Sequence, residues 1–246
     1  RRSQTKQGAL LPMLLVAGVV LVIAAAMYLL DADDIDPATS CPKKGPSSVT
    51  VVIIDTSDPL APHQIAAFEK FTDSLINTPK SGEAVTANSD SNNYVQRHHF
   101  LVGYEIADES GQPRRLFGQC NPGDPDERKA RGKITEGEIV AQIRWSKFTQ
   151  DLAAAFPKEK LRKTAPTSPI LETIRYVRRA EYPSSSQLKA SGQRAGTIFI
   201  ISDMLQYSDR LSHFGAELPA VENVATSFAL DLTGIDIGIR YLKFDK

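Results

Sequence analysis

Oxygen-bearing side chains gather in three segments of the sequence. These segments are Asp55–Pro59 (DTSDP), Thr167–Pro169 (TSP) and Ser202–Met204 (SDM), and the first and last of them each follow an apolar run. Carboxylates and hydroxyls are hard oxygen ligands, which suit Mg²⁺, Ca²⁺ or Mn²⁺ better than zinc or copper. If the fold brings the three segments together, they offer the ligands of a divalent-cation site.

Each segment also has a purely structural explanation. Asp58 can cap a helix that begins at the proline after it, and Thr167 or Ser168 can cap a helix opened by the next proline. Asp203 can likewise accept hydrogen bonds from the backbone N–H groups that follow its strand. Capping does not explain why two buried strands both end in aspartate at the same expected crevice, because unpaired carboxylates repel one another. Both explanations are consistent with the sequence.

Hydrophobic patterning predicts the elements that position these segments. Val49–Ile54 (VTVVII) and Gly196–Ser202 (GTIFIIS) are nearly continuous apolar runs, typical of strands buried on both faces. Apolar residues at helical spacing predict three helices. In chain order we expect strand 49–54, helix 59–76, strands 99–106 and 115–119, helices 134–156 and 169–180, and strands 196–202 and 235–244.

This order of elements indicates an α/β fold. Strands that alternate with helices, apart from one hairpin at 99–119, predict a doubly wound, mostly parallel sheet with one antiparallel edge strand. In such sheets ligands bind beyond the carboxyl ends of the strands, near the point where the strand order reverses. Asp55 and Asp203 each follow a predicted parallel strand, so both are expected at that end. The Ser- and Asn-rich segment 77–96 is predicted to be a long surface loop.

The oxygen-bearing residues resemble the metal-ion-dependent adhesion site of the von Willebrand factor A family. That site is written Asp-x-Ser-x-Ser, followed by a distant Thr and then a distant Asp. Asp55 and Ser57 match its first two positions. Thr167, or the adjacent Ser168, is the candidate threonine, and Asp203 matches the late aspartate.

The resemblance covers about residues 49–244 and implies both a Rossmann-like fold and a binding function. It implies that Asp55, Ser57, Thr167 and Asp203 hold a Mg²⁺, Ca²⁺ or Mn²⁺ ion directly or through water. The ion then leaves one coordination position for an acidic side chain of a protein partner.

One residue departs from the family pattern at the proposed ion site. Pro59 stands where the family has its second serine, so one hydroxyl ligand is missing. Metal affinity is therefore expected to be weaker or absent. Without an ion, the same end of the sheet is expected to act as a metal-free surface that docks a protein.

An uncharged apolar run at residues 8–30 predicts a membrane-spanning helix. Three basic residues precede it and four acidic residues follow within 31–36, so the positive-inside rule assigns the N-terminus to the cytoplasm and the remainder to the periplasm or the cell exterior. A cleaved signal peptide is the alternative, but this run exceeds the usual apolar region of such peptides. The expected organisation is cytoplasmic N-terminus 1–7, transmembrane helix 8–30, linker 31–48 and a von Willebrand factor A-like domain 49–246.

The chain has two cysteines, Cys41 and Cys120. An exported domain favours one structural disulfide, while two separate buried thiols are the alternative, and the spacing fits no metal-binding pattern. In the topology that the resemblance implies, both cysteines flank the end of the sheet opposite Asp55 and Asp203. A disulfide would therefore join the linker to that end.

Basic residues gather on the helix predicted at 169–180. Arg175, Arg178 and Arg179 lie there beside Tyr176. We expect them to form the solvent-exposed face of the helix, and a surface for an acidic partner is the alternative.

Composition and motifs narrow the functional classes. Lys and Arg together number 29, as do Asp and Glu, so the net charge of zero argues against a nucleic-acid partner. We find no Gly-x-Ser-x-Gly elbow, glycine-rich phosphate loop or dinucleotide fingerprint. The sequence therefore predicts a membrane-anchored protein-binding module of an envelope complex, and not an enzyme.

Two other functions are compatible with the sequence. A phosphatase or hydrolase could use Asp55 as nucleophile, as in the haloacid dehalogenase phosphatases, although Ser57 stands where that family needs its second aspartate. A structural subunit could instead form an oligomer through the small residues of the segment 8–30.

Overall fold

The computed structural model describes most of the chain that follows the apolar segment. The predicted cytoplasmic segment 1–7 and transmembrane helix 8–30 lie outside the described residues, as does most of the loop predicted at 77–96. Within the part that is described, no helix combines the length and the apolar character needed to cross a membrane. The described ranges are 35–77, 94–106, 112–126, 137–157, 165–184, 186, 196–215 and 217–242.

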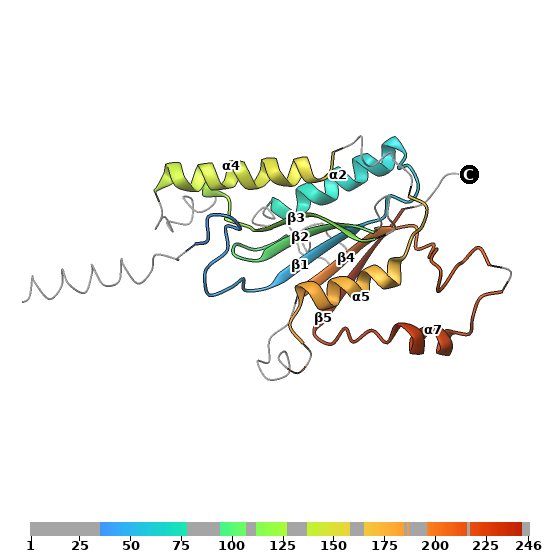
Figure 1. Ribbon diagram of the computed structural model, residues 1–246. Coiled ribbons are helices and arrows are strands. Elements are labelled where there is room, and N and C mark those ends of the chain that lie inside the picture. The colour runs from blue at the N-terminus through green and yellow to red at the C-terminus, as the bar shows by residue number, and fades with distance from the viewer. Residues whose placement is uncertain are drawn as a thin grey trace, which may run out of the picture.

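The domain is an α/β fold built on one sheet of five strands (Figure 1). The strand order is β3-β2-β1-β4-β5, with β3 antiparallel to β2 at one edge and the other pairs parallel. The predicted α/β class, the mostly parallel sheet and its single antiparallel edge strand are confirmed. The strands are β1 (Val49–Ile54), β2 (Phe100–Glu105), β3 (Arg114–Cys120), β4 (Gly196–Ser202) and β5 (Ile235–Tyr241).

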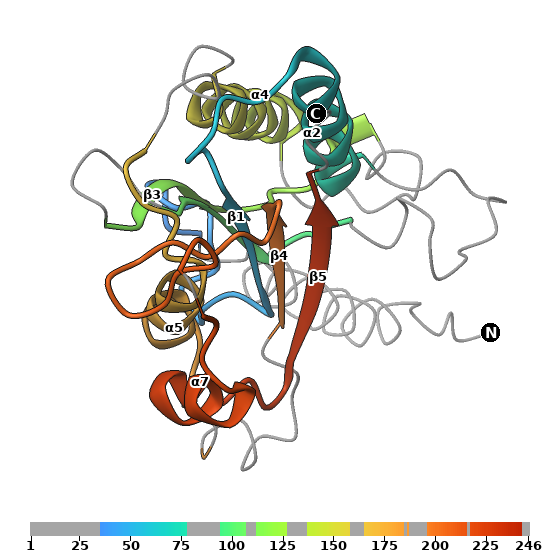
Figure 2. The ribbon, with the colours of Figure 1, turned by 90° about the vertical axis from the view of Figure 1, so that its right-hand side faces the viewer.

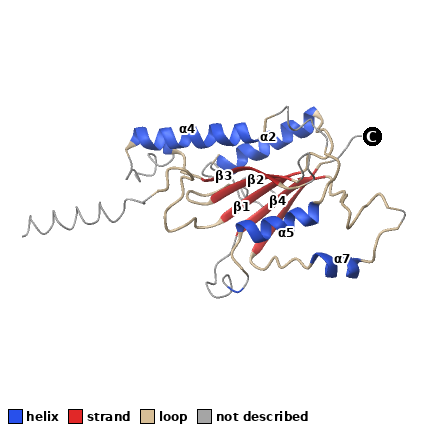
Figure 3. Ribbon diagram, in the orientation of Figure 1, coloured by secondary structure: helices blue, strands red, loops and turns tan. Residues whose placement is uncertain are grey.

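Helices cover both faces of the sheet, which gives the domain three layers (Figures 2 and 3). Helices α2 (Pro62–Ile76) and α4 (Glu138–Ala155) pack on one face, and α5 (Ile170–Glu181) packs on the other. A short helix, α7 (Val221–Phe228), contacts α5. Because β1 lies between these layers, it must be apolar on both sides.

The core explains the bounds of β1. All of its residues are buried, with Val51 and Ile53 facing α5, and Val52 and Ile54 facing α2 and α4. Fully burying each such side chain contributes about 1.5–3 kcal/mol. The two-sided burial therefore holds the central strand firmly, and the polar residue that follows it marks the carboxyl end of the sheet.

Helix α2 begins one turn later than predicted. Asp58 is exposed and does not cap it, because the chain first carries Leu60 into the core. The cap residue is Ala61, whose backbone N–H donates to Oε1 of Gln64 at 2.7 Å. The buried Gln64 side chain thus replaces the aspartate that the sequence suggested.

The other element boundaries agree with the predictions to within a few residues, but one helix and the exposure of one side chain differ from them. Helix α7 was not predicted, because Phe228 is its one buried residue and so leaves no apolar stripe in the sequence. The expectation that Arg178 lies on the exposed face of α5 was wrong. Arg178 is only 9% exposed and donates hydrogen bonds to the backbone carbonyls of Asp231, Tyr182 and Pro183.

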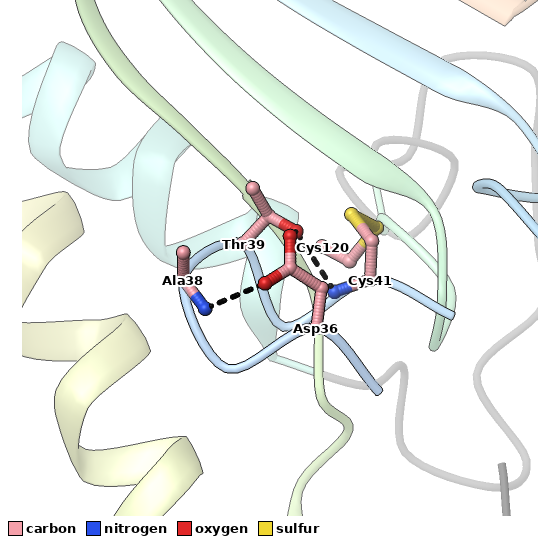
Figure 4. The surroundings of a disulfide bond; sticks show 5 residues. All are labelled: Asp36, Ala38, Thr39, Cys41 and Cys120. Atoms are coloured by element: carbon pink, nitrogen blue, oxygen red, sulfur yellow. Dashed lines mark hydrogen bonds between the residues drawn. A yellow bond between two sulfur atoms is a disulfide. The ribbon is translucent and has the colours of Figure 1, made fainter. Parts of the chain in front are cut away.

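A disulfide joins Cys41 to Cys120, as predicted (Figure 4). Cys120 lies opposite Phe100, the first residue of β2, so the bridge is at the amino end of the parallel strands. Next to it, the Asp36 carboxylate accepts hydrogen bonds from the Ala38 N–H at 3.0 Å and the Thr39 hydroxyl at 2.8 Å. The segment before β1 is therefore tied to the end of the sheet that lies away from Asp55.

Removing the disulfide should lower the stability of the domain strongly. The bridge closes a loop with a sequence separation of 79 residues. Loop-closure entropy in the unfolded chain then predicts a loss of about 4 kcal/mol for Cys41→Ser. Denaturant titration should report this loss, and the oxidised wild type treated with reductant should match the variant. Equal stability of the oxidised and reduced proteins would contradict the prediction.

Candidate functional site

Asp55 lies at the centre of a buried polar cluster beyond the carboxyl end of β1. Its Oδ2 accepts hydrogen bonds from the hydroxyls of Ser168 and Ser202, each at 2.8 Å, and its Oδ1 accepts one from the Ser57 N–H at 3.0 Å. The two serines are 113 and 147 positions away in the sequence. Asp55 is 5% exposed. One carboxylate therefore joins three distant segments of the chain.

Strand register brings Asp55 to Ser202. Ile54 lies opposite Ile201 in the parallel pair of β1 and β4, and the Asp55 N–H donates to the carbonyl of Ile201 at 2.8 Å. The next residue of β4, Ser202, is then next to the carboxylate of Asp55. Because β1 and β4 are the strands between which the order reverses, this cluster occupies the position where doubly wound sheets bind ligands.

A short backbone bridge positions Ser168. Its N–H donates to the carbonyl of Tyr207 at 2.8 Å, and its carbonyl accepts from the Tyr207 N–H at 2.9 Å. This bridge attaches the segment that leads into α5 to the loop that follows β4. The Ser168 hydroxyl can then reach Asp55.

Asp203 lies beside the cluster and is partly exposed. Its Oδ1 accepts the Leu205 N–H at 2.9 Å, and Met204 between them adopts a left-handed backbone conformation with φ of 62°. Partial burial raises the pKa of Asp203 above its usual value, and the negative charges of Asp55 and Asp58 raise this pKa further. The charges of Asp55 and Asp58 therefore reach Asp203.

Thr167 and Ser168 have different environments, although the sequence offered either as the threonine of the site. The Ser168 hydroxyl binds Asp55, whereas the buried Oγ1 of Thr167 has no hydrogen-bond partner among the described residues. A buried hydroxyl without a partner is unusual, because its loss of hydration is not compensated. The structure thus brings Asp55, Ser57, Ser168 and Asp203 to one place, and Thr167 precedes Ser168 in the chain.

Sequence reasoning missed two parts of this end of the sheet. It did not assign Ser202 to Asp55, since that contact depends on the strand register. It also missed Glu105, which accepts the Thr56 hydroxyl at 2.8 Å and two hydrogen bonds from the Arg114 guanidinium at 2.5 and 3.0 Å. Like Asp55, Glu105 is an acidic residue that ends an apolar strand, and this was the available signal.

The oxygen atoms of this cluster could coordinate a hard cation only if hydroxyl groups serve as ligands beside the carboxylates. In the ranges that the structure describes, no group of three His, Cys, Asp or Glu side chains could hold a metal ion. Ser168 gives its proton to Asp55, so the lone pairs of its oxygen stay available, and no described residue bonds the Thr167 hydroxyl. Together with Asp203 these oxygens are of the type that Mg²⁺ and Ca²⁺ prefer.

No family model matches the chain, and no curated protein shows significant sequence similarity to it. Its function is therefore inferred from the fold and from the geometry of this site.

Replacing Asp203 by Asn should stabilise the cation-free protein at neutral pH. Because the pKa of Asp203 is raised on folding, the folded state holds this proton more tightly than the unfolded state. Its ionisation therefore lowers stability as the pH rises above the usual pKa of 3.8. The amide of Asp203→Asn still accepts the Leu205 N–H but carries no charge.

Thermal melts in EDTA across a pH series test this expectation. The Asp203→Asn variant should melt above the wild type at neutral pH, and the difference should disappear at pH values well below 3.8. Asp73→Asn, at an exposed position on α2, is the matched control. A lower melting temperature for Asp203→Asn at neutral pH would contradict the electrostatic interpretation.

Proposed function

We propose that this protein is a membrane-anchored, von Willebrand factor A-like module that binds a protein partner at the carboxyl end of its sheet. The observation that supports it most directly is the hydrogen-bonded cluster of Asp55, Ser168 and Ser202 at the reversal of strand order. The hairpin of β2 and β3 also agrees with the order of elements in that family. In this proposal the protein is a component of an envelope complex and not an enzyme.

A divalent cation links the site to its partner in this proposal. Asp55, Ser57, Thr167 and Asp203 hold the ion directly or through water, and Ser168 adds a hydroxyl oxygen. The ion, when bound, would supply a positive charge and an open coordination position for a carboxylate of the partner. Asp55 contributes by accepting the protons of Ser168 and Ser202, which keeps both hydroxyls ordered before any ion arrives.

The surroundings of Asp55 argue against a hydrolase that would use this residue as nucleophile. Both of its oxygens accept hydrogen bonds and its side chain is almost completely buried. Hydrogen bonds stabilise the carboxylate and make it a poorer nucleophile, and burial keeps substrate away from it. This environment suits a residue that orders ligands.

The disulfide supports the orientation of the module. Cys41 follows the apolar segment 8–30 closely in the sequence and is bonded to the amino end of the sheet. With 8–30 as the membrane anchor, the amino end of the sheet faces the membrane. The Asp55 cluster then faces away from the membrane, toward a partner in the periplasm or outside the cell.

Thermal melts with EDTA or with added Mg²⁺, Ca²⁺ or Mn²⁺ test the cation site. An ion present at 100 times its dissociation constant adds about 2.7 kcal/mol of stability. We expect one of these ions to raise the melting temperature of the oxidised 246-residue chain, and we expect no rise for Asp203→Asn.

The matched control is Asp73→Asn, which removes the same charge on the exposed side of α2 and should keep the full response. If none of the three ions raises the melting temperature of the wild type, the proposed cation site is wrong. The carboxyl end of the sheet then remains a metal-free docking surface. An equal rise in the melting temperature of Asp203→Asn would show that the ion binds at another site.

A further inference from the structure

A cavity of about 740 Å³ lies beside α5, next to the Asp55 cluster. Thr167 and Pro169 form its border with that cluster, since Ser168 lies between them in the chain. Its basic residues come from two segments: Arg175 and Arg179 from α5, and Arg210 from the loop after β4. We call it the arginine cavity.

The three guanidinium groups of the arginine cavity have no ion-pair or hydrogen-bond partner within the described part of the chain. Other arginines close by are engaged: Arg114 binds Glu105, and Arg178 binds three backbone carbonyls. Arg175 and Arg179 are one helical turn apart on α5, so they lie on the same side of the helix. Positive charge that is not neutralised within the fold is thus concentrated around one hollow.

The acidic residues of the arginine cavity only partly offset this charge. Glu172 already accepts hydrogen bonds from the Gln206 amide at 2.8 Å and the Ser208 hydroxyl at 2.6 Å. Asp209 is the other acidic residue of the lining. Three positive and two negative charges leave a positive excess, so the cavity favours an anionic ligand.

Apolar surface forms a large part of the cavity wall. Tyr176, which is 50% exposed, lies between the two arginines of α5 in the sequence, and Pro169 and Ala180 also line the cavity. Walls of this kind bind an aromatic or aliphatic side chain, whereas inorganic phosphate makes no use of them. The volume also lies in the range of ligand-binding pockets.

We infer that the arginine cavity binds an acidic peptide segment, with its carboxylates on Arg175, Arg179 and Arg210 and an apolar side chain against Tyr176. Guanidinium groups suit this role because they bind carboxylates through paired hydrogen bonds. Only the assignment of this segment to the protein partner rests on the proposed function. The preference for acidic peptides follows from the cavity itself and needs no cation.

Fluorescence anisotropy with the labelled peptide Asp-Glu-Phe-Glu-Asp, measured on the 246-residue chain in EDTA, tests this inference. We expect binding that weakens as salt is added, and no binding of the neutral peptide Asn-Gln-Phe-Gln-Asn. Each of Arg175→Ala, Arg179→Ala and Arg210→Ala should weaken binding roughly fivefold or more. Arg144→Ala removes the same charge from α4, on the opposite face of the sheet, and should leave the affinity unchanged.

Several results would overturn the inference. Equal binding of the neutral peptide would remove the role of the carboxylates, and equal loss in Arg144→Ala would indicate attraction by overall charge. Displacement of the peptide by inorganic phosphate at equal concentration would identify a phosphate site instead. Because the three arginines are partly or fully exposed, their variants should melt like the wild type, which separates loss of binding from loss of folding.

The outcome is also separable from that of the cation site. Peptide binding in EDTA that depends on the three arginines supports the arginine cavity even if no divalent ion stabilises the protein. Stabilisation by a divalent ion without any peptide binding would contradict the proposed role of the arginine cavity but would still support the cation site.

Discussion

The hydrogen bonds from Ser168 and Ser202 to the buried carboxylate of Asp55 organise the carboxyl end of this protein. A buried charge is tolerated only when polar partners surround it, so the ionised carboxylate requires both hydroxyls. Meeting that requirement determines where the chain leaves β4 and where it enters α5. The crevice, Asp203 and the border of the arginine cavity all follow from these two positions.

The two ends of the sheet differ in the interactions that they contain. At the amino end, the Cys41–Cys120 disulfide ties the preceding segment to the sheet, and the apolar layers hold β1 between the helices. At the carboxyl end, carboxylates and hydroxyls meet, and guanidinium groups lie beside them. The proposed cation site and the arginine cavity therefore lie side by side at this end, so both proposals direct an acidic partner to the same surface.

Predictions from the sequence were accurate where a residue's environment is set by its neighbours in the chain. The bounds of β1 and β4 were found because strands buried on both faces must be apolar throughout. Predictions were wrong or incomplete where the partner is distant. Arg178 was expected to be exposed because one of its three carbonyl partners, that of Asp231, lies 53 positions away and leaves no signal in the local pattern. Ser202 was left unassigned because its contact depends on strand register. The start of α2 was missed because a buried glutamine caps it.

A double-mutant cycle between Asp55→Ala and Ser202→Ala tests the central role of the Asp55 carboxylate most directly. Free energies of unfolding would be measured for the wild type, both single variants and the double variant. If the carboxylate organises the site, the two changes should be coupled by about 1–3 kcal/mol, since either one removes the same hydrogen bond. The same cycle with Ser74→Ala, whose hydroxyl bonds within α2, should be additive. Additive effects for Ser202 as well would contradict the account.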